Sequence, residues 1–222
     1  MTGALNVSQL LNTPQFSQSV QLILSLALIS LVPFLLVSVT SFLRIIIVFG
    51  LVRTAVGTQQ VPPNSVLVGL ALFMTVFVMT PVWKEINDAA VVPYSRNKIS
   101  MVKAAEVGMK PLTRFMLRQT REKDLALFVQ FARIKPPTRM EEVPIYIVIP
   151  SFMISELKTA FQIGFLLFIP FIIIDLVVAN ILLSLGMFML SPVMVSLPFK
   201  ILLFVLADGW NLISRGLLMS FR

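Results

Sequence analysis

Long apolar runs, separated by one charged interval, set the pattern of this chain. The first apolar run, Val20 to Leu51, is longer than the roughly 20 residues that a membrane-crossing helix needs. Pro33 interrupts this run, and proline removes a backbone donor and clashes with the preceding turn. We therefore predict two helical pieces or one long bent helix here. The second run, Val66 to Trp83, holds 18 residues without a charge and completes an apolar helical hairpin.

A connector, Gly57 to Asn64, joins the two runs. Its two adjacent prolines exclude a continuous helix, and Gly57 is well placed to cap the C-terminal end of the first run. Asn64-Ser65 is typical of the N-cap of the second run. Gln59 and Gln60 place amide donors and acceptors in an apolar setting, so we expect them to bond backbone groups of a neighbouring subunit. A solvated turn is the alternative.

The interval from Lys84 to Glu142 differs from the apolar runs, since it holds 19 of the chain's 28 charged residues, twelve basic and seven acidic. We expect this part to face water and to contain two amphipathic helices. One helix is predicted to begin with Pro111 at its first position, and the other to have Asp124 as its N-cap. Lys135-Pro136-Pro137 is expected to end the second helix.

A third apolar stretch, Val143 to Arg222, is predicted to form a second hairpin. Pro150 breaks its first arm near the start, and the arms are joined by a linker from Gly186 to Pro192. The fold class is therefore all-α, with membrane-associated helical hairpins, long kinked apolar helices and a polar, amphipathic helical middle region. The predicted division is a polar segment at 1–19, a first apolar hairpin at 20–83, a charged middle region at 84–142, and a second apolar hairpin at 143–222 with a loop at 186–192.

The polar segment before the first apolar run contains neither Lys nor Arg. A secretory signal peptide begins with a basic region. We therefore interpret the first apolar run as part of the mature protein.

Composition excludes several functional classes. Hydrophobic residues make up 57% of the chain and charged residues 13%, against about 45–50% and roughly 25% in soluble domains. A soluble single-domain enzyme is excluded on this ground. The absence of Cys and His removes disulfides, thiolate metal sites and the commonest general base, so we expect no enzyme, cofactor or metal. The net charge of +8 lies mostly in one segment without a nucleic-acid-binding motif.

Seven charged residues lie in or beside the apolar segments, where an unpaired charge costs several kcal/mol. Their near balance of sign predicts pairing. For Arg53 and Lys200 the alternative is that their long side chains extend to lipid headgroups. The side chain of Asp175 is too short to reach them. A solute or ion transporter would use Asp175, Lys158 and Arg44 as a relay. The full set is Arg44, Arg53, Glu156, Lys158, Asp175, Lys200 and Asp208.

Glu156 and Lys158 are two residues apart, which places them on opposite faces of a helix. They are therefore unable to pair within one helix. An acid on one face and a base on the other suit a head-to-tail assembly, in which each acid meets the base of the next subunit. Two separate pairs within the subunit are the alternative.

Three stretches resemble the FliP/SctR family, the core export-gate proteins of bacterial type III secretion. They are SFLRIIIVFGLVRTAVGTQQVPPNSVLVGLALFMTVFVMTPV (Ser41 to Val82), ISELKTAFQIGFLLFIPFIIIDLVVA (Ile154 to Ala179) and GMFMLSPVMVSLPFKILLFVLADGW (Gly186 to Trp210). REKDLALF (Arg121 to Phe128) adds a fourth match. LPFK, REKDLALF and GTQQ are more similar to the flagellar branch than to the virulence injectisome branch.

The resemblance implies a pore-forming subunit without covalent chemistry. Members assemble as five copies with FliQ/SctS and FliR/SctT, beside FlhA/SctV and FlhB/SctU, at the centre of the basal body in the bacterial inner membrane. Unfolded secreted proteins pass through this pore. The family's methionine-rich constriction corresponds here to Met187, Phe188 and Met189, and Phe188 departs from the usual methionine. Ordinary core packing of these side chains is the alternative.

A physical rule and the family resemblance place the charged middle region on opposite sides of the membrane. The positive-inside rule places the basic middle region in the cytoplasm, whereas the resemblance places it on the periplasmic side. We follow the resemblance, because the rule describes single inserted chains. In an assembly, apolar surface becomes contact between subunits, and protein neighbours satisfy charges that lipid leaves unpaired.

Overall fold

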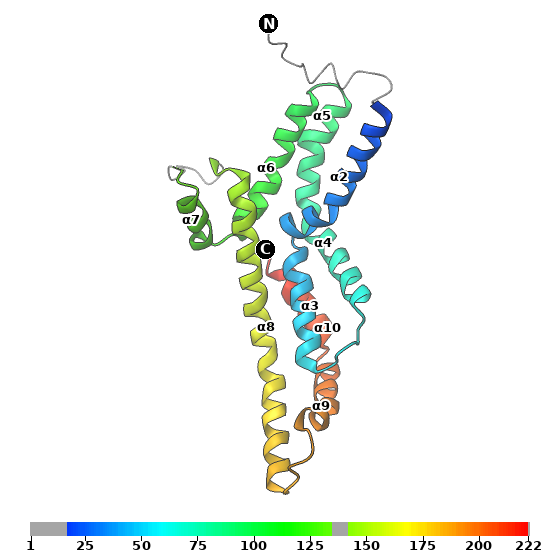
Figure 1. Cartoon of the computed structure of the whole chain (residues 1–222), viewed down its shortest axis with the longest axis vertical. Coiled ribbons are helices and arrows are strands. Elements are labelled where there is room, and N and C mark those ends of the chain that lie inside the picture. Colours follow the sequence, from blue (N-terminus) through cyan, green and yellow to red (C-terminus); the bar gives the residue numbers. More distant parts are fainter. Residues whose placement is uncertain (1–16, 135–141, 222) are drawn as a thin grey trace. The chain divides into compact units, whose positions relative to one another are not determined.

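The computed structural model describes residues 17–134 and 142–221, and within these ranges it contains helices and no strand, which confirms the all-α fold class (Figure 1). The chain forms two compact units, Met1–Val37 and Ser38–Arg222. The predicted polar segment at 1–19 falls almost entirely outside the described residues, as does the expected stop at Lys135-Pro136-Pro137. The four-part division of the sequence stays a prediction.

The first unit consists of most of helix α2, Ser17–Val39. The run does form two helical pieces, as predicted, but the first helix continues through Pro33, so the predicted interruption at this proline is wrong. The chain breaks instead at Thr40 and Ser41, just before α3, Phe42–Val56. At this break the backbone N–H of Phe42 donates to the Thr40 hydroxyl at 3.3 Å, a local bond that competes with the helical pattern.

The second arm of the first hairpin extends beyond its predicted end. Helix α4, Asn64–Ile86, contains Pro81 and continues into a π-helical turn, Asn87–Val91, and a short helix α5, Val92–Ser95. Pro63, not Asn64, is the N-cap residue of α4. The helix therefore continues past the end of the apolar run into the charged interval, because backbone hydrogen bonding does not require apolar side chains.

Both helix starts predicted in the middle region are wrong. Helix α6, Met101–Gln119, holds Pro111 in its interior, and its N-cap is Ser100, whose hydroxyl accepts from the N–H of Lys103 at 3.3 Å. Helix α7, Glu122–Phe131, has Arg121 as its N-cap. Asp124 instead lies in the first turn, where its negative charge favours the positive end of the helix dipole.

Helix α8, Ile145–Ser184, is one helix of 40 residues that includes Pro150 and Pro170. The predicted break at Pro150 is therefore wrong. Packing explains the continuity, since Val148 and Phe152, on either side of this proline, have no exposed surface. Neighbouring helices and side-chain hydroxyls compensate for the bond a proline loses.

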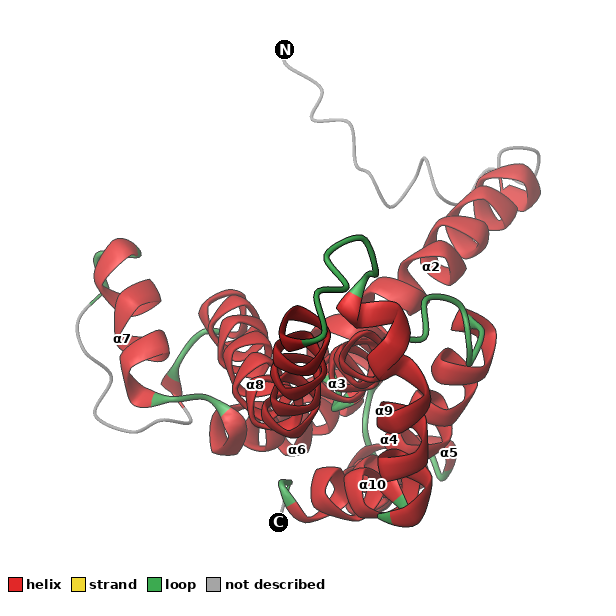
Figure 2. Cartoon of the chain, turned by 90° about the horizontal axis from the view of Figure 1, so that it is seen from below, coloured by secondary structure: helices red, strands yellow, loops and turns green. Residues whose placement is uncertain are grey.

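A core of the second unit forms where α4, α6 and the start of α8 meet. Met79, Met116 and Phe152 are fully buried there. The rings of Phe115 and Phe152 pack with centroids 6.0 Å apart. Helix α7 lies on the outside of α8, as the view in Figure 2 shows. This core fixes the charged helices to the apolar ones.

Helix α3 lies beside α8 in both views (Figures 1 and 2). Its residues Ile45, Val48 and Phe49 are fully buried. Gly164 of α8 faces Leu51 of α3 so closely that an added Cβ would lie 2.2 Å from its Cδ1 atom. Glycine at this position therefore leaves room for the Leu51 side chain against α8.

The second hairpin is completed by α9, Pro192–Leu206, and α10, Gly209–Met219, which meet at a bend of 61°. Among the described residues, the helical spans Asn64–Ser95 and Ile145–Ser184 are each long and apolar enough to cross a membrane. The bent pair of α9 and α10 qualifies only if its two halves count as one span. The arrangement is that of an all-α membrane protein.

Candidate functional site

The segment between α8 and α9 is a loop, as predicted for Gly186 to Pro192. The N–H of Gly186 donates to the carbonyl of Leu183 at 3.1 Å, and the N–H of Met187 to that of Leu182 at 2.9 Å. This pair of bonds is the Schellman motif that ends a helix at a left-handed residue, and Gly186 has a φ of 72°. Pro192 occupies the first turn of α9, where its missing N–H costs nothing.

The side chains of this loop are apolar and extend outward. Met187 is 45% exposed, Phe188 76% and Met189 101%. They are therefore not core packing within the chain, which was the alternative interpretation. Contiguous exposed apolar residues of this kind mark a surface that meets another protein, a lipid or copies of itself.

A polar cluster links α8 to α9 behind the loop. The Asp175 carboxylate accepts from the Lys200 ammonium group at 2.5 Å and from the Ser196 hydroxyl at 2.5 Å. The Lys200 side chain is 5% exposed and that of Asp175 30%. Lys200 therefore pairs within the chain and does not extend to a headgroup. Asp175 lies nine residues before the end of α8, roughly 14 Å along the helix axis, so it holds the two arms together near the loop.

A second polar cluster, here called the Arg44 cluster, joins four helices. The guanidinium group of Arg44 in α3 donates to both carboxylate oxygens of Glu156 in α8. It also donates to the Gln119 side-chain oxygen at 3.0 Å and to the Ser220 carbonyl at 3.0 Å. Its carbon Cζ lies 3.9 Å from the centroid of the Phe221 ring. One buried guanidinium therefore connects α3, α6, α8 and the end of α10.

This cluster overturns the expected pairing of Glu156 with Lys158 of a neighbouring subunit. Glu156 is fully buried, and a side chain from its own chain engages both of its oxygens. The alternative of a local pair is therefore correct for Glu156. Lys158 is exposed and forms no ion pair among the residues described. Glu156 is buried and Lys158 is exposed, so the two side chains lie on different faces of α8, as their spacing predicts.

The connector contains a different contact from the one predicted. Arg53 donates to the Asn64 side-chain oxygen at 2.6 Å and to the Pro62 carbonyl at 3.3 Å, so it closes the connector onto α3. Gly57 caps α3 as predicted, with a φ of 90° and its N–H bonded to the carbonyl of Thr54. Gln59 and Gln60 are exposed. Their proposed bonds to another subunit stay a prediction.

The remaining embedded acid, Asp208, lies at the bend between α9 and α10. It has a left-handed backbone conformation, with a φ of 48°, and its carboxylate accepts from the Asn211 amide at 2.9 Å. Asp208 is exposed and has no cationic partner within the described ranges. Of the seven charges expected to pair, four form ion pairs, and Asp208, Lys158 and Arg53 form none among the described residues.

Sequence reasoning missed the neutral members of both clusters. Ser196 supports Asp175, while Gln119 and Ser220 complete the partners of Arg44. Of these residues, only Ser196 has a signal in the sequence, because Ser196 and Lys200 are four residues apart and share a helix face. Gln119 and Ser220 are distant in sequence from Arg44, so only the packed helices reveal them.

Comparison with known proteins is consistent with this architecture. The FliP family model matches residues 25–217. The flagellar biosynthetic protein FliP of Bacillus subtilis (strain 168) is 51% identical over 221 residues, which cover 100% of both chains. Its counterpart from Pectobacterium carotovorum subsp. carotovorum is 54% identical over 203 residues, 91% of this chain and 79% of its own.

The same protein from Caulobacter vibrioides is 50% identical over 203 residues, 91% of this chain and 76% of its own. These relatives all carry the flagellar name, which agrees with the branch indicated by LPFK, REKDLALF and GTQQ. The resemblance drawn from the sequence is thus confirmed. On the matched range and the identity over nearly its whole length, the chain belongs to the FliP family.

Proposed function

We propose that this chain is a pore-forming core subunit of the flagellar type III protein export gate, through which unfolded substrates pass. Its family membership supports a role in flagellar protein export. In this proposal the chain assembles as several copies, five by analogy with the family, together with FliQ and FliR. FlhA-like and FlhB-like proteins work beside the assembly, and the chain itself performs no covalent chemistry.

The exposed apolar loop carries the proposal. A secretion pore must admit an unfolded chain and yet stop ions at rest. Charged side chains hold water, whereas a ring of apolar side chains can close a narrow passage by dewetting. Met187 and Met189 have three rotatable side-chain bonds each, which lets them adapt to a passing chain. Several copies of Met187-Phe188-Met189 would form such an apolar collar.

Because four of the embedded charges pair inside the chain, the outer surface of the apolar helices is free to contact other subunits. Arg44 with Glu156, and Lys200 with Asp175, find their partners inside one chain. The remaining surface of α8 is strongly apolar and exposed, as Phe161 at 58% and Phe165 at 69% show. Such a surface can meet lipid or another subunit without leaving a buried charge unpaired. We place the assembly in the inner membrane, largely on its periplasmic side, with the charged middle region in water.

A solute transporter built on Arg44, Lys158 and Asp175 is the weaker candidate. The two acids, Glu156 paired with Arg44 and Asp175 paired with Lys200, are 19 residues apart on one helix, roughly 28 Å along its axis. Within the described ranges no acid or base on α8 lies between Lys158 and Asp175 to relay a proton. The equivalent injectisome subunit would use the same geometry, but the flagellar names of the relatives favour the export gate of the flagellum.

Co-expression with the FliQ and FliR proteins of the same bacterium tests the proposal. We expect the detergent-solubilised chain to purify with both, and native mass spectrometry to give a complex containing several copies of it. Phe165→Asp should prevent assembly, because it places a charge on the apolar face of α8. Lys103→Gln, on exposed α6, is the matched control and should assemble normally. A chain that stays single in the presence of both partners would contradict the proposal.

A further inference from the structure

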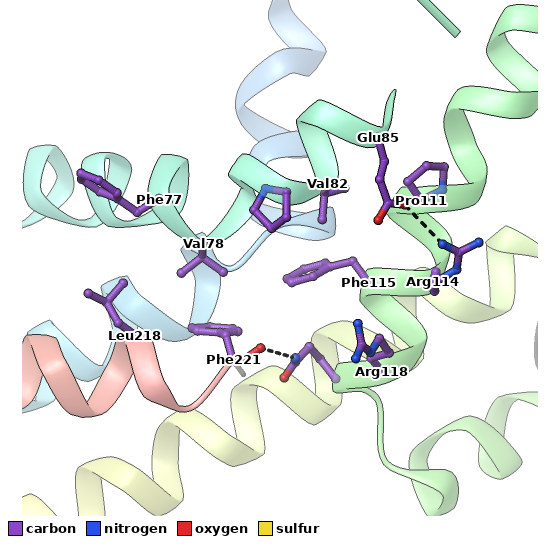
Figure 3. Close-up of a pocket in the computed structure, with 12 residues that line it drawn as sticks. Phe77, Val78, Val82, Glu85, Pro111, Arg114, Phe115, Arg118, Leu218 and Phe221 are labelled. Atoms are coloured by element: carbon purple, nitrogen blue, oxygen red, sulfur yellow. Dashed lines mark hydrogen bonds and ion pairs between the residues drawn. The ribbon is translucent and has the colours of Figure 1, made fainter. Parts of the chain in front are cut away.

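A cavity of about 570 Å³ lies between α4, α6 and the end of α10 (Figure 3). Its volume falls within the roughly 300–1,000 Å³ typical of sites for small ligands. Most of the residues that line it are apolar, and its aromatic rings come from α4, from α6 and from the segment that follows α10. The apolar lining includes Phe77, Val78, Val82, Phe115, Leu218 and Phe221.

The polar groups of the cavity gather at its other end. Figure 3 shows Phe77 and Leu218 at one side, and Arg114 and Arg118 at the opposite side. Arg114 donates to the Glu85 carboxylate at 3.2 Å, and this pair is more than half exposed. The cavity is therefore amphiphilic, with an apolar end and a basic end.

Arg118 is the group that gives this end its unsatisfied charge. Arg118 is exposed at the cavity and has neither a hydrogen bond nor an ion pair among the described residues. Its neighbour Gln119 is already engaged, because it accepts from Arg44 and donates to the Phe221 carbonyl at 3.4 Å. A guanidinium group without a partner beside an apolar cavity is complementary to an anion that carries an apolar tail.

We propose that this cavity binds an anionic phospholipid, whose phosphate pairs with Arg118 and whose acyl chain lies along the apolar wall. The location supports a lipid, since the wall belongs partly to the Asn64–Ser95 span, which is long and apolar enough to cross a membrane. Phe73 and Phe77 on this span are 71% and 73% exposed. An acyl chain can therefore reach the cavity along an apolar surface. A free phosphate would leave the apolar wall uncovered.

The test uses the full chain, purified in detergent, stripped of lipid and titrated with phosphatidylglycerol. Native mass spectrometry should show one retained lipid, and phosphatidylcholine of the same acyl length should bind about tenfold more weakly. Arg118→Gln should weaken phosphatidylglycerol binding by about tenfold, the scale of one lost charge-assisted hydrogen bond. Arg96→Gln removes an exposed arginine that lies outside the cavity lining, and it should leave binding unchanged.

A second variant tests the apolar end. Leu218→Trp should fill the wall at a partly exposed position, and it should reduce binding of both lipids while the melting temperature of the lipid-free chain stays the same. Equal binding of the two lipids to the wild type would overturn the proposal. So would full binding by Arg118→Gln, or displacement of phosphatidylglycerol by millimolar inorganic phosphate, which would show a simple anion site. These readouts do not depend on assembly into an export gate.

Discussion

Arg44 of α3 and Glu156 of α8 form an ion pair between residues 112 positions apart, and their side chains are 3% and 0% exposed. Burying two charges is costly, and the cost is offset only when all their hydrogen-bonding capacity is used. Arg44 meets this condition by also bonding Gln119 and Ser220. The pair therefore fixes where α3, α6 and the end of α10 meet α8.

Removing one member of this pair should strongly destabilise the chain. Arg44→Gln leaves the Glu156 carboxylate buried without a cation, so we expect a loss of about 3–5 kcal/mol in the free energy of unfolding. Thermal unfolding in detergent measures it. Lys103→Gln breaks an exposed ion pair, whose members are 54% and 57% exposed, and should cost no more than about 1 kcal/mol. Similar losses in the two variants would show that the buried cluster has no special role.

Gly164 offers a separate test of the packing between α3 and α8. Gly164→Ala places a Cβ 2.2 Å from the Cδ1 atom of Leu51, so we expect overpacking to cost about 1–3 kcal/mol. Gly69→Ala is the matched control, because Gly69 lies inside α4 with nothing within 4 Å of its added Cβ. That control should be neutral or stabilising by up to about 1 kcal/mol. A tolerated Gly164→Ala would mean that the two helices pack less closely.

Asp175→Asn should loosen the base of the loop. The substitution leaves the Lys200 ammonium group buried without its anionic partner, while Ser196 keeps an acceptor. We expect faster hydrogen exchange and faster proteolysis at residues 185–191 in the purified chain. Asp208→Asn, at an exposed acid whose carboxylate accepts from the Asn211 side chain, is the control. Unchanged hydrogen exchange at the loop would show that the Asp175 cluster does not hold the loop in position.

Gln59 and Gln60 test the connector. They are exposed, so replacing both with Ala should leave the melting temperature of the isolated chain unchanged. If their amides bond a neighbouring subunit, the same variant should lower the yield of the assembled complex. Gln130→Ala, at an exposed position on α7, is the control. Normal yield and normal motility of the double variant would favour a solvated turn.

The sequence predicted the helical class, the Gly57 cap and the loop between α8 and α9, because each depends on local chemistry, although Pro192 itself begins α9. It placed breaks at Pro33 and Pro150 that the helices do not have. At Pro150, packing across helices outweighs the loss of one backbone bond, whereas the helix around Pro33 is exposed and no packing among the described residues explains its continuity. The balance of charge predicted that the embedded charges pair, but it did not name Lys200 as the partner of Asp175. The partner of Glu156 did not, because Arg44 becomes its neighbour only after the helices pack.

In the proposed function, Met187, Phe188 and Met189 seal the pore of the export gate. The direct measurement is ion conductance, or uptake of a small normally excluded solute, in cells whose export gate carries a deletion of Met187 to Met189. We predict an assembled complex of normal mass with raised leakage, and a smaller rise when the three residues are replaced by Ala. Leakage at the wild-type level in a normally assembled deletion variant would contradict the account, because the seal would then lie elsewhere.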